Sequence, residues 1–147
     1  KKNITNLILE LATEKENNGY LFKYNGLTLL QSYTSRDKEL IMGKAVSIVV
    51  QKSTISSILP FVKEQDTTEG FFKWFGLRDV ITKKPRVVLL NNLMFLDLVN
   101  KGVEFVEKIS LITAKTLAEL EKLKTIEELE HFNYEVYFSI FLKEQGG

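Results

Sequence analysis

Acidic side chains that could bind a magnesium ion occur around one segment that the sequence predicts as a strand. Asp37, Glu39 and Lys44 lie beside this segment, and further acids follow the helix predicted after it. A magnesium-dependent nuclease needs two or three carboxylates and a lysine at the edge of a sheet. The run Val49–Lys52 carries Gln51 where such a site has an acid. The sequence therefore favours solvated surface acids, and we predict no bound metal.

Other residue types that perform catalysis or hold a cofactor are scarce. His131 is the only histidine, so no histidine pair for zinc exists, and a serine triad would need His131 itself. The chain has no cysteine, which excludes disulfides, thiolate ligands and a cysteine nucleophile. The glycines form neither a P-loop nor a dinucleotide-binding pattern. We therefore predict no cofactor and assign no catalytic residue. Catalysis would regain support only if the scattered acids, Asp37, Glu39, Asp66, Glu69, Asp79 and Asp97, met in the fold.

Aromatic and basic residues are densest in residues 65–85, which we predict as a long connecting loop, and the group extends to Arg86. Bulky apolar residues are too many here for an exposed loop, so some must be buried in the domain or against a partner. The predicted interaction residues are Phe71, Phe72, Lys73, Trp74, Phe75, Arg78, Lys83, Lys84 and Arg86. Rings that stack on bases and cations that neutralise phosphates would instead contact nucleic acid, which is the alternative.

Composition indicates one globular domain. The chain has 147 residues, of which 44% are apolar and 27% charged, and its formal net charge is +1. Such a charge gives no overall attraction for nucleic acid or an anionic membrane. No apolar run is long enough to span a bilayer and no secretory signal is visible, so together with the absence of cysteine we expect an intracellular, cytoplasmic protein without membrane contact.

The residues from Arg86 to Thr113 predict a strand, a helix and a second strand. Val87–Leu90 is a short apolar run, Asn91 or Asn92 can cap the helix that follows, and Gly102 would end it. Val103–Ile112 would then be the second strand, with a right-handed crossover between the two strands. The residues expected to form one buried cluster are Ile48, Val88, Leu90, Leu96, Phe105 and Leu111.

The flanking sequence predicts further helices and strands. Residues 3–15 have the apolar spacing of an amphipathic helix, and Asn25-Gly26 between two β-prone runs is typical of a hairpin. Ala45–Val50 and Tyr134–Leu142 are rich in β-branched or aromatic residues and are predicted as strands. A helix should begin at Thr113 or Thr116, and Thr125 should open a shorter one through a capping box.

These elements predict a single three-layer α/β domain spanning residues 1–147, with a mixed α+β arrangement as the alternative. Initiator methionine is not normally removed before lysine, so Lys1 indicates a piece of a longer protein, and we interpret Gly146-Gly147 as a remnant of cloning or a mobile end. The preferred function is a non-enzymatic interaction or assembly module of a larger protein or complex, whose partner is another protein or a domain of the parent chain. The alternative is a nucleic-acid-binding or metal-dependent nuclease-like domain, intact or degenerate. A third hypothesis is a small-molecule sensor with a pocket near Asn91 and Thr113.

Overall fold

The computed structural model describes residues 1–58 and 70–139, and for residues 51–58 it describes the backbone alone. An N-terminal helix, a β-hairpin, and then helices and strands follow one another, so the prediction of an α/β fold class is confirmed. In chain order the elements are α1 (Lys2–Asn18), β1 (Tyr20–Tyr24), β2 (Leu27–Gln31), α2 (Ser35–Ile58), β3 (Phe72–Trp74), β4 (Leu77–Asp79), β5 (Val88–Leu90), α3 (Asn92–Glu121) and α4 (Ile126–Glu130). Residues 135–139 are also helical.

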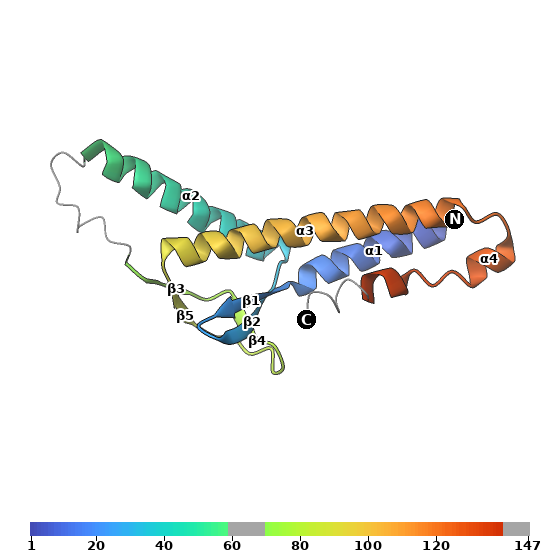
Figure 1. Ribbon diagram of the computed structural model, residues 1–147, viewed down its shortest axis with the longest axis horizontal. Coiled ribbons are helices and arrows are strands. Elements are labelled where there is room, and N and C mark those ends of the chain that lie inside the picture. Colours follow the sequence, from blue (N-terminus) through green and yellow to red (C-terminus); the bar gives the residue numbers. More distant parts are fainter. Residues whose placement is uncertain (59–69, 140–147) are drawn as a thin grey trace.

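Helix α3 is the axis of the molecule (Figure 1). Helix α1 lies alongside its C-terminal half and runs in the opposite direction, while the strands and the start of α2 lie at its N-terminal half. The remainder of α2 projects away from the strands. A 30-residue helix is about 45 Å long, so no single layer can cover it, and different elements cover its two halves.

Two small antiparallel sheets cover the first half of α3. One has the order β1-β2-β4, and the other pairs β3 with β5. The chain from β3 through β4 and back to β5 forms a long hairpin, which we call the ribbon (residues 72–90). Between the pairs Trp74–Val88 and Arg78–Pro85, the outgoing arm has residues 75–77 and the returning arm only 86–87. The ribbon therefore contains a β-bulge, which bends it so that its two ends belong to different sheets.

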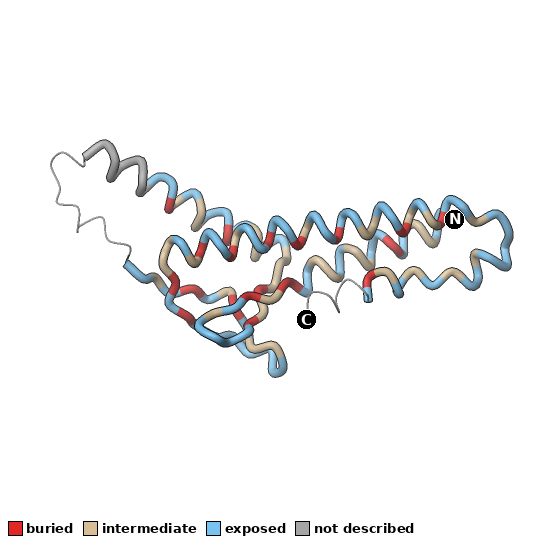
Figure 2. Tube along the Cα trace, viewed as in Figure 1, coloured by how far each residue is buried: buried red, intermediate tan, exposed pale blue. Residues whose placement is uncertain are grey.

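The buried residues form two clusters along α3 (Figure 2). The larger one joins the inner faces of both sheets to Phe95, Leu98 and Phe105 of α3, with Ile41 and Ile48 of α2. The smaller one joins Ile8, Leu120 and Phe138 near the other end of α3. Partly buried Ala12 and Ile112 contact both clusters, so the core is continuous along the helix.

Three predicted strands are wrong. Residues 103–112 belong to α3 and residues 45–50 to α2, while residues 135–139 of the predicted C-terminal strand are helical and its remaining residues lie outside the described part. No strand follows α3 in the described residues, so the predicted crossover does not exist and neither Thr113 nor Thr116 begins a helix. Apolar run length alone does not separate a strand from a buried helix segment, and α3 is such a case.

Gly102 does not end a helix, because it lies in the middle of α3. A Cβ atom at this position would stand 3.0 Å from the Tyr20 hydroxyl oxygen and 3.2 Å from that of Tyr33. The Tyr20 hydroxyl donates to the carbonyl of Leu98 at 2.6 Å, one turn earlier in the helix. Gly102 is therefore explained by the close approach of two tyrosines and not by a change of backbone direction.

The predicted buried cluster is correct for Ile48, Val88, Leu90 and Phe105 and wrong for the other two residues. Leu96 is 38% exposed and Leu111 is 56% exposed. Both lie on the exposed side of α3. They were expected to be buried because Leu111 was assigned to a strand and Leu96 to a short helix that ended at Gly102, and neither element occurs.

Local signals were correct at one turn and at two helix starts. Asn25 and Gly26 have φ of 45° and 85°, which confirms the predicted hairpin turn. Asn91 caps α3 by accepting from the Met94 amide at 2.8 Å, and Thr125 caps α4 by accepting from the Glu128 amide at 3.1 Å. His131 is the exposed C-cap residue of α4.

Gly102→Val should lower the free energy of unfolding by about 1 to 3 kcal/mol, because its side chain would displace Tyr20 and Tyr33 from α3. Gly43→Ala is the matched control, since Gly43 also lies within a helix but a Cβ there meets nothing within 4 Å. That substitution should raise the free energy by up to about 1 kcal/mol through helix propensity. Chemical denaturation measures both, and an equal response of the two sites would contradict the role given to Gly102.

Candidate functional site

Strand β3 divides the predicted interaction residues between two faces. Phe72 and Trp74 point toward α3, where their ring centroids lie 5.7 and 5.0 Å from that of Phe95. Lys73 lies between them in the sequence and is exposed. Because side chains alternate along a strand, two of the aromatic residues anchor the ribbon in the core and are not available to a partner.

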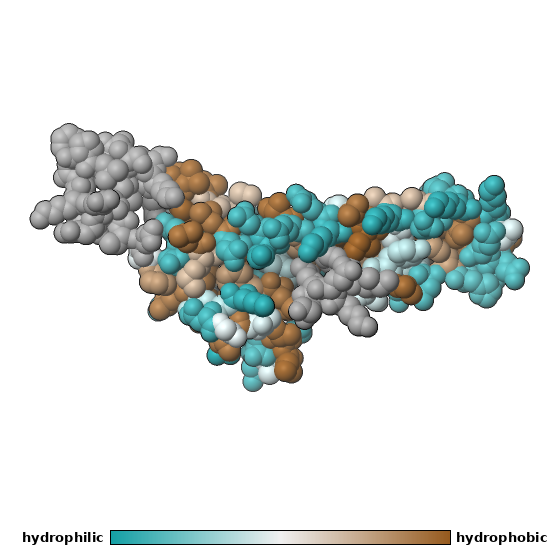
Figure 3. Space-filling view, viewed as in Figure 1, coloured by the Kyte–Doolittle hydropathy of each residue, from teal (hydrophilic) through white to brown (hydrophobic). Residues whose placement is uncertain are grey.

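The other face of the ribbon is apolar and exposed. Lys73 pairs directly with Leu89, so these two side chains share one face. We define the ribbon face as Phe71, Lys73, Phe75, Val87 and Leu89. Its apolar side chains are between 48% and 66% exposed, and Figure 3 shows apolar surface over this region. Adjacent exposed apolar side chains of this size are unusual unless something covers them.

The basic residues of the predicted set other than Lys73 gather at the turn of the ribbon. Arg78 donates to the Lys83 carbonyl at 3.3 Å, and Arg86 lies 4.0 Å from the Asp79 carboxylate. Lys83 and Lys84 complete this group, and all four basic side chains are exposed. The turn therefore presents positive charge beside the ribbon face, with one carboxylate among it.

The side chain of Asp79 holds the turn by accepting hydrogen bonds from backbone amides. Its carboxylate accepts from the amides of Thr82 at 3.0 Å and Ile81 at 2.9 Å. These hydrogen bonds, that of Thr82 first, hold the pKa of Asp79 below its usual range, and nearby Arg86 adds to the effect. The charged form of the carboxylate therefore stabilises the conformation that presents Lys83 and Lys84.

Trp74 has a second fixed contact, at the bulge. Its indole Nε1–H donates to Oε1 of Gln31 at 2.9 Å, and Gln31 in turn donates to the Ser32 carbonyl at 2.8 Å. A Cβ at Gly76 would lie 2.8 Å from the indole nitrogen and 3.0 Å from the Gln31 oxygen. Gly76 is thus required by the close approach of this buried pair, and truncation of Trp74 would test stability before it tested binding.

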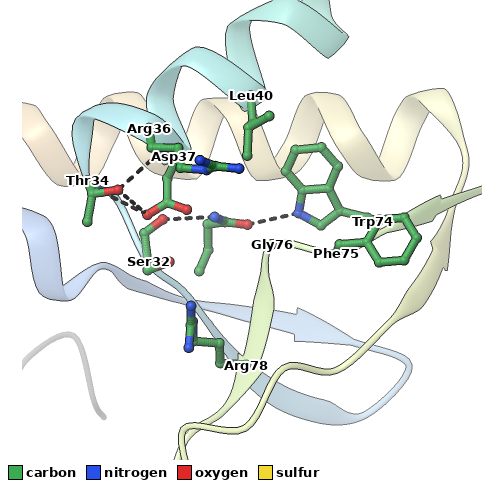
Figure 4. Close-up of a pocket in the computed structure, with 10 residues that line it drawn as sticks. Ser32, Thr34, Arg36, Asp37, Leu40, Trp74, Phe75, Gly76 and Arg78 are labelled. Atoms are coloured by element: carbon green, nitrogen blue, oxygen red, sulfur yellow. Dashed lines mark hydrogen bonds between the residues drawn. The ribbon is translucent and has the colours of Figure 1, made fainter.

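A pocket of about 420 Å³ opens beside this pair, between the start of α2 and the bulge (Figure 4). Thr34 and Asp37 hold the helix start by a capping box, in which the Asp37 amide donates to Thr34 Oγ1 at 3.2 Å and the Thr34 amide to Asp37 Oδ2 at 2.9 Å. The residues that line the pocket are Gln31, Ser32, Thr34, Arg36, Asp37, Leu40, Trp74, Phe75, Gly76 and Arg78.

The acids considered for metal binding do not meet in the described residues. Asp37 lies at the start of α2, Asp79 in β4 and Asp97 in α3, while Asp66 and Glu69 lie outside the described part. No group of three or more histidine, aspartate or glutamate side chains there could hold a metal ion. The predicted pocket near Asn91 and Thr113 is also wrong, because the 21 residues between them are helical and the two positions lie about 33 Å apart along α3.

Comparisons with known proteins found no relative: no family model, curated protein or solved structure matches the chain. None of the helices that the structure describes is both long and apolar enough to cross a membrane. The site must therefore be interpreted from its own geometry.

Of the residues that line the pocket, sequence reasoning singled out only Asp37, Trp74, Phe75 and Arg78, and it missed the others, including Gln31 and Arg36. The sequence did contain one usable signal, since Thr34 and Asp37 have the spacing of a capping box directly before an apolar run. That signal would have predicted a helix start at Ser35 and placed Arg36 in its first turn. Nothing in the sequence indicated that Gln31 would meet Trp74, because the two residues are 43 positions apart.

Lowering the pH should loosen the ribbon turn. Because the folded pKa of Asp79 is depressed, its stabilising contribution is complete above the unfolded pKa, near 4, and is lost as the pH falls through the folded value. The amide signals of Ile81 and Thr82 in NMR spectra should shift together in that range. Asp79→Asn keeps an acceptor oxygen and should abolish this titration without releasing the turn, whereas Asp79→Ala should release it at every pH. If the amide signals of Ile81 and Thr82 still shifted with pH in Asp79→Asn, the shift could not be assigned to the Asp79 carboxylate.

Proposed function

We propose that this chain is a non-enzymatic protein-interaction module whose ribbon face binds an apolar, acidic segment of another protein or of its own parent polypeptide. The observation that carries the proposal is the exposure of Phe71, Phe75, Val87 and Leu89 side by side on a ribbon that is anchored from behind. Interfaces of this kind centre on aromatic and aliphatic side chains with a polar rim.

The anchoring matters for affinity. Phe72 and Trp74 pack on Phe95, and Val88 and Leu90 are buried, so the strands that display the ribbon face are held in one conformation. A surface fixed before binding loses little conformational entropy when it binds. This supports a docking surface more than a loop that folds on contact.

Charge supports an acidic partner. Within residues 70–90 the chain has Lys73, Arg78, Lys83, Lys84 and Arg86 against a single acid, Asp79. Lys73 lies on the ribbon face itself, and the remaining basic residues lie at the turn beside it. A partner with one or more carboxylates among its apolar side chains would be complementary to both, and the turn charges would chiefly raise the association rate.

Nucleic acid is the second candidate, because the same basic group beside Phe71 and Phe75 could contact phosphates and bases. Two features favour protein. Val87 and Leu89 are aliphatic and offer no stacking surface, and the overall charge of +1 gives little long-range attraction for a polyanion. Arg86 also lies near a carboxylate, which reduces the charge available to phosphate.

A phage-displayed random peptide library, selected on the protein, tests the ribbon face. Enriched peptides should combine aromatic or aliphatic residues with aspartate or glutamate. Leu89→Ser should weaken their binding by about tenfold or more in fluorescence polarisation, as loss of a central apolar contact does. Ile81→Ser is the control for polarity, since Ile81 is an exposed aliphatic residue, 89% exposed against 48% for Leu89, but lies at the tip of the turn, away from the ribbon face. Peptides that bind Leu89→Ser and wild type alike, or lack acidic residues, would contradict the proposal.

Titration with generic single- and double-stranded oligonucleotides at low and moderate salt separates the second candidate. We expect no tight binding at either salt concentration. The double variant Lys83→Glu, Lys84→Glu should slow peptide association moderately and leave the peptide complex stable. Tight oligonucleotide binding that falls steeply with salt and is abolished by this variant would instead establish nucleic acid as the partner.

A further inference from the structure

The pocket between the start of α2 and the bulge has a charged side and an apolar side, and of its lining residues only Phe75 also belongs to the ribbon face. Arg36 and Arg78 reach it from α2 and β4, while Leu40, Trp74 and Phe75 supply apolar and aromatic surface (Figure 4). We propose that this pocket binds a small organic anion that carries an aromatic ring, such as an aryl carboxylate or an aryl phosphate.

The charged side is ready for an anion. Neither Arg36 nor Arg78 forms an ion pair with any side chain in the part of the chain that is described, and Arg78 uses one nitrogen to donate to the Lys83 carbonyl at 3.3 Å. Asp37 is the one acid that lines the pocket, and Thr34 occupies its Oδ2 through both the amide and the hydroxyl, at 2.9 and 2.7 Å. The carboxylate is thus already committed to the helix cap, and the two guanidinium groups leave the pocket with a positive balance. Guanidinium groups bind carboxylates and phosphates through paired hydrogen bonds.

The apolar side is fixed in advance. The indole of Trp74 is held by the hydrogen bond to Gln31 and by its contact with Phe95, and Gly76 leaves no side chain between the indole and the pocket. Phe75 and Leu40 remain 66% and 53% exposed, so both can still bury apolar area against a ligand. An aromatic ring would gain more from this surface than a small inorganic anion.

The volume of the pocket limits the size of the ligand that it can bind. A pocket of about 420 Å³ lies within the range that small-molecule sites occupy, roughly 300 to 1,000 Å³. It has room for a bicyclic acid and not for a nucleic-acid duplex or a folded partner. The site shares Phe75 with the ribbon face and Arg78 with the basic group at the turn, but its ligand is a small molecule, so it goes beyond the proposed interaction function and does not depend on it.

Trp74 provides a direct readout, because it is the only tryptophan and its indole N–H gives a single signal in ¹H–¹⁵N NMR spectra. Three probes are titrated into the wild-type protein: naphthalene-2-carboxylate, 2-naphthyl phosphate and naphthalene-2-carboxamide. The carboxylate or the phosphate should shift the indole signal saturably, and the neutral amide should bind about tenfold or more weakly. Comparison of the two anions tells which one the arginines prefer. Because this arm uses the wild type alone, it does not rely on any variant folding.

Substitutions then test whether Arg36 and Arg78 are the residues that bind the anion. Arg36→Gln and Arg78→Gln should each weaken the better anion about fivefold or more, whereas Arg86→Gln, which removes an exposed arginine outside the pocket, should leave affinity unchanged. Leu89→Ser should also leave it unchanged, which separates this site from the ribbon face. Equal binding of the amide and the acid, an equal loss in Arg86→Gln, or no saturable shift with either anion would overturn the proposal.

Discussion

The close contact of Tyr20 and Tyr33 with α3 at Gly102 is the constraint on which the remaining packing depends. Both rings also contact Phe105, so the hairpin strand β1 and the segment leading to α2 are registered on the same turn of the helix. Burial raises the pKa of Tyr20 far above its usual value, and its hydroxyl therefore stays a donor to the Leu98 carbonyl at any ordinary pH. With β1 fixed on this turn, β2 is positioned by pairing with β1, and β4 by pairing with β2. This pairing places the bulge of the ribbon next to the start of α2.

The parts of the fold that could be predicted are those specified within a few residues. The Asn25-Gly26 turn, the Asn91 cap and the Thr125 capping box each depend on one side chain and its nearest amides. The amphipathic pattern of α1 was also readable, because its partly buried residues recur with helical spacing. In the ribbon, the density of aromatic residues correctly indicated that some were buried, and strand alternation then decided which ones.

What could not be predicted required knowledge of contacts between distant residues. In α2, apolar residues occur all around the helix, so the run Ala45–Val50 showed no helical period. Its β-branched composition therefore led to the wrong prediction of a strand. In α3, Gly102 resembled the end of a helix in the sequence. Its actual role, which is to leave room for Tyr20 and Tyr33, depends on residues about 80 and 70 positions away. The spacing of Phe95, Leu98, Phe105 and Ile109 is nevertheless helical across that glycine, and the period would have been the better guide.

The bulge connects the two surfaces that we assign to binding. Before it, β3 directs Trp74 inward and leaves Phe71 and Lys73 outward; after it, β4 pairs with β2 and carries Arg78 toward the start of α2. An unbulged hairpin would keep a single plane and could not place Arg78 and Trp74 around one pocket while Leu89 stayed on an outer face. Because a Cβ at Gly76 would meet Trp74 and Gln31, any side chain there would disturb the pocket first. The ribbon face, anchored through Phe72 and Leu90 on the far side of the bulge, would be affected less. The two binding surfaces share Phe75 and the anchor Trp74 but otherwise use different residues, so substitutions at Arg36 or Leu89 can change one surface while the other is retained.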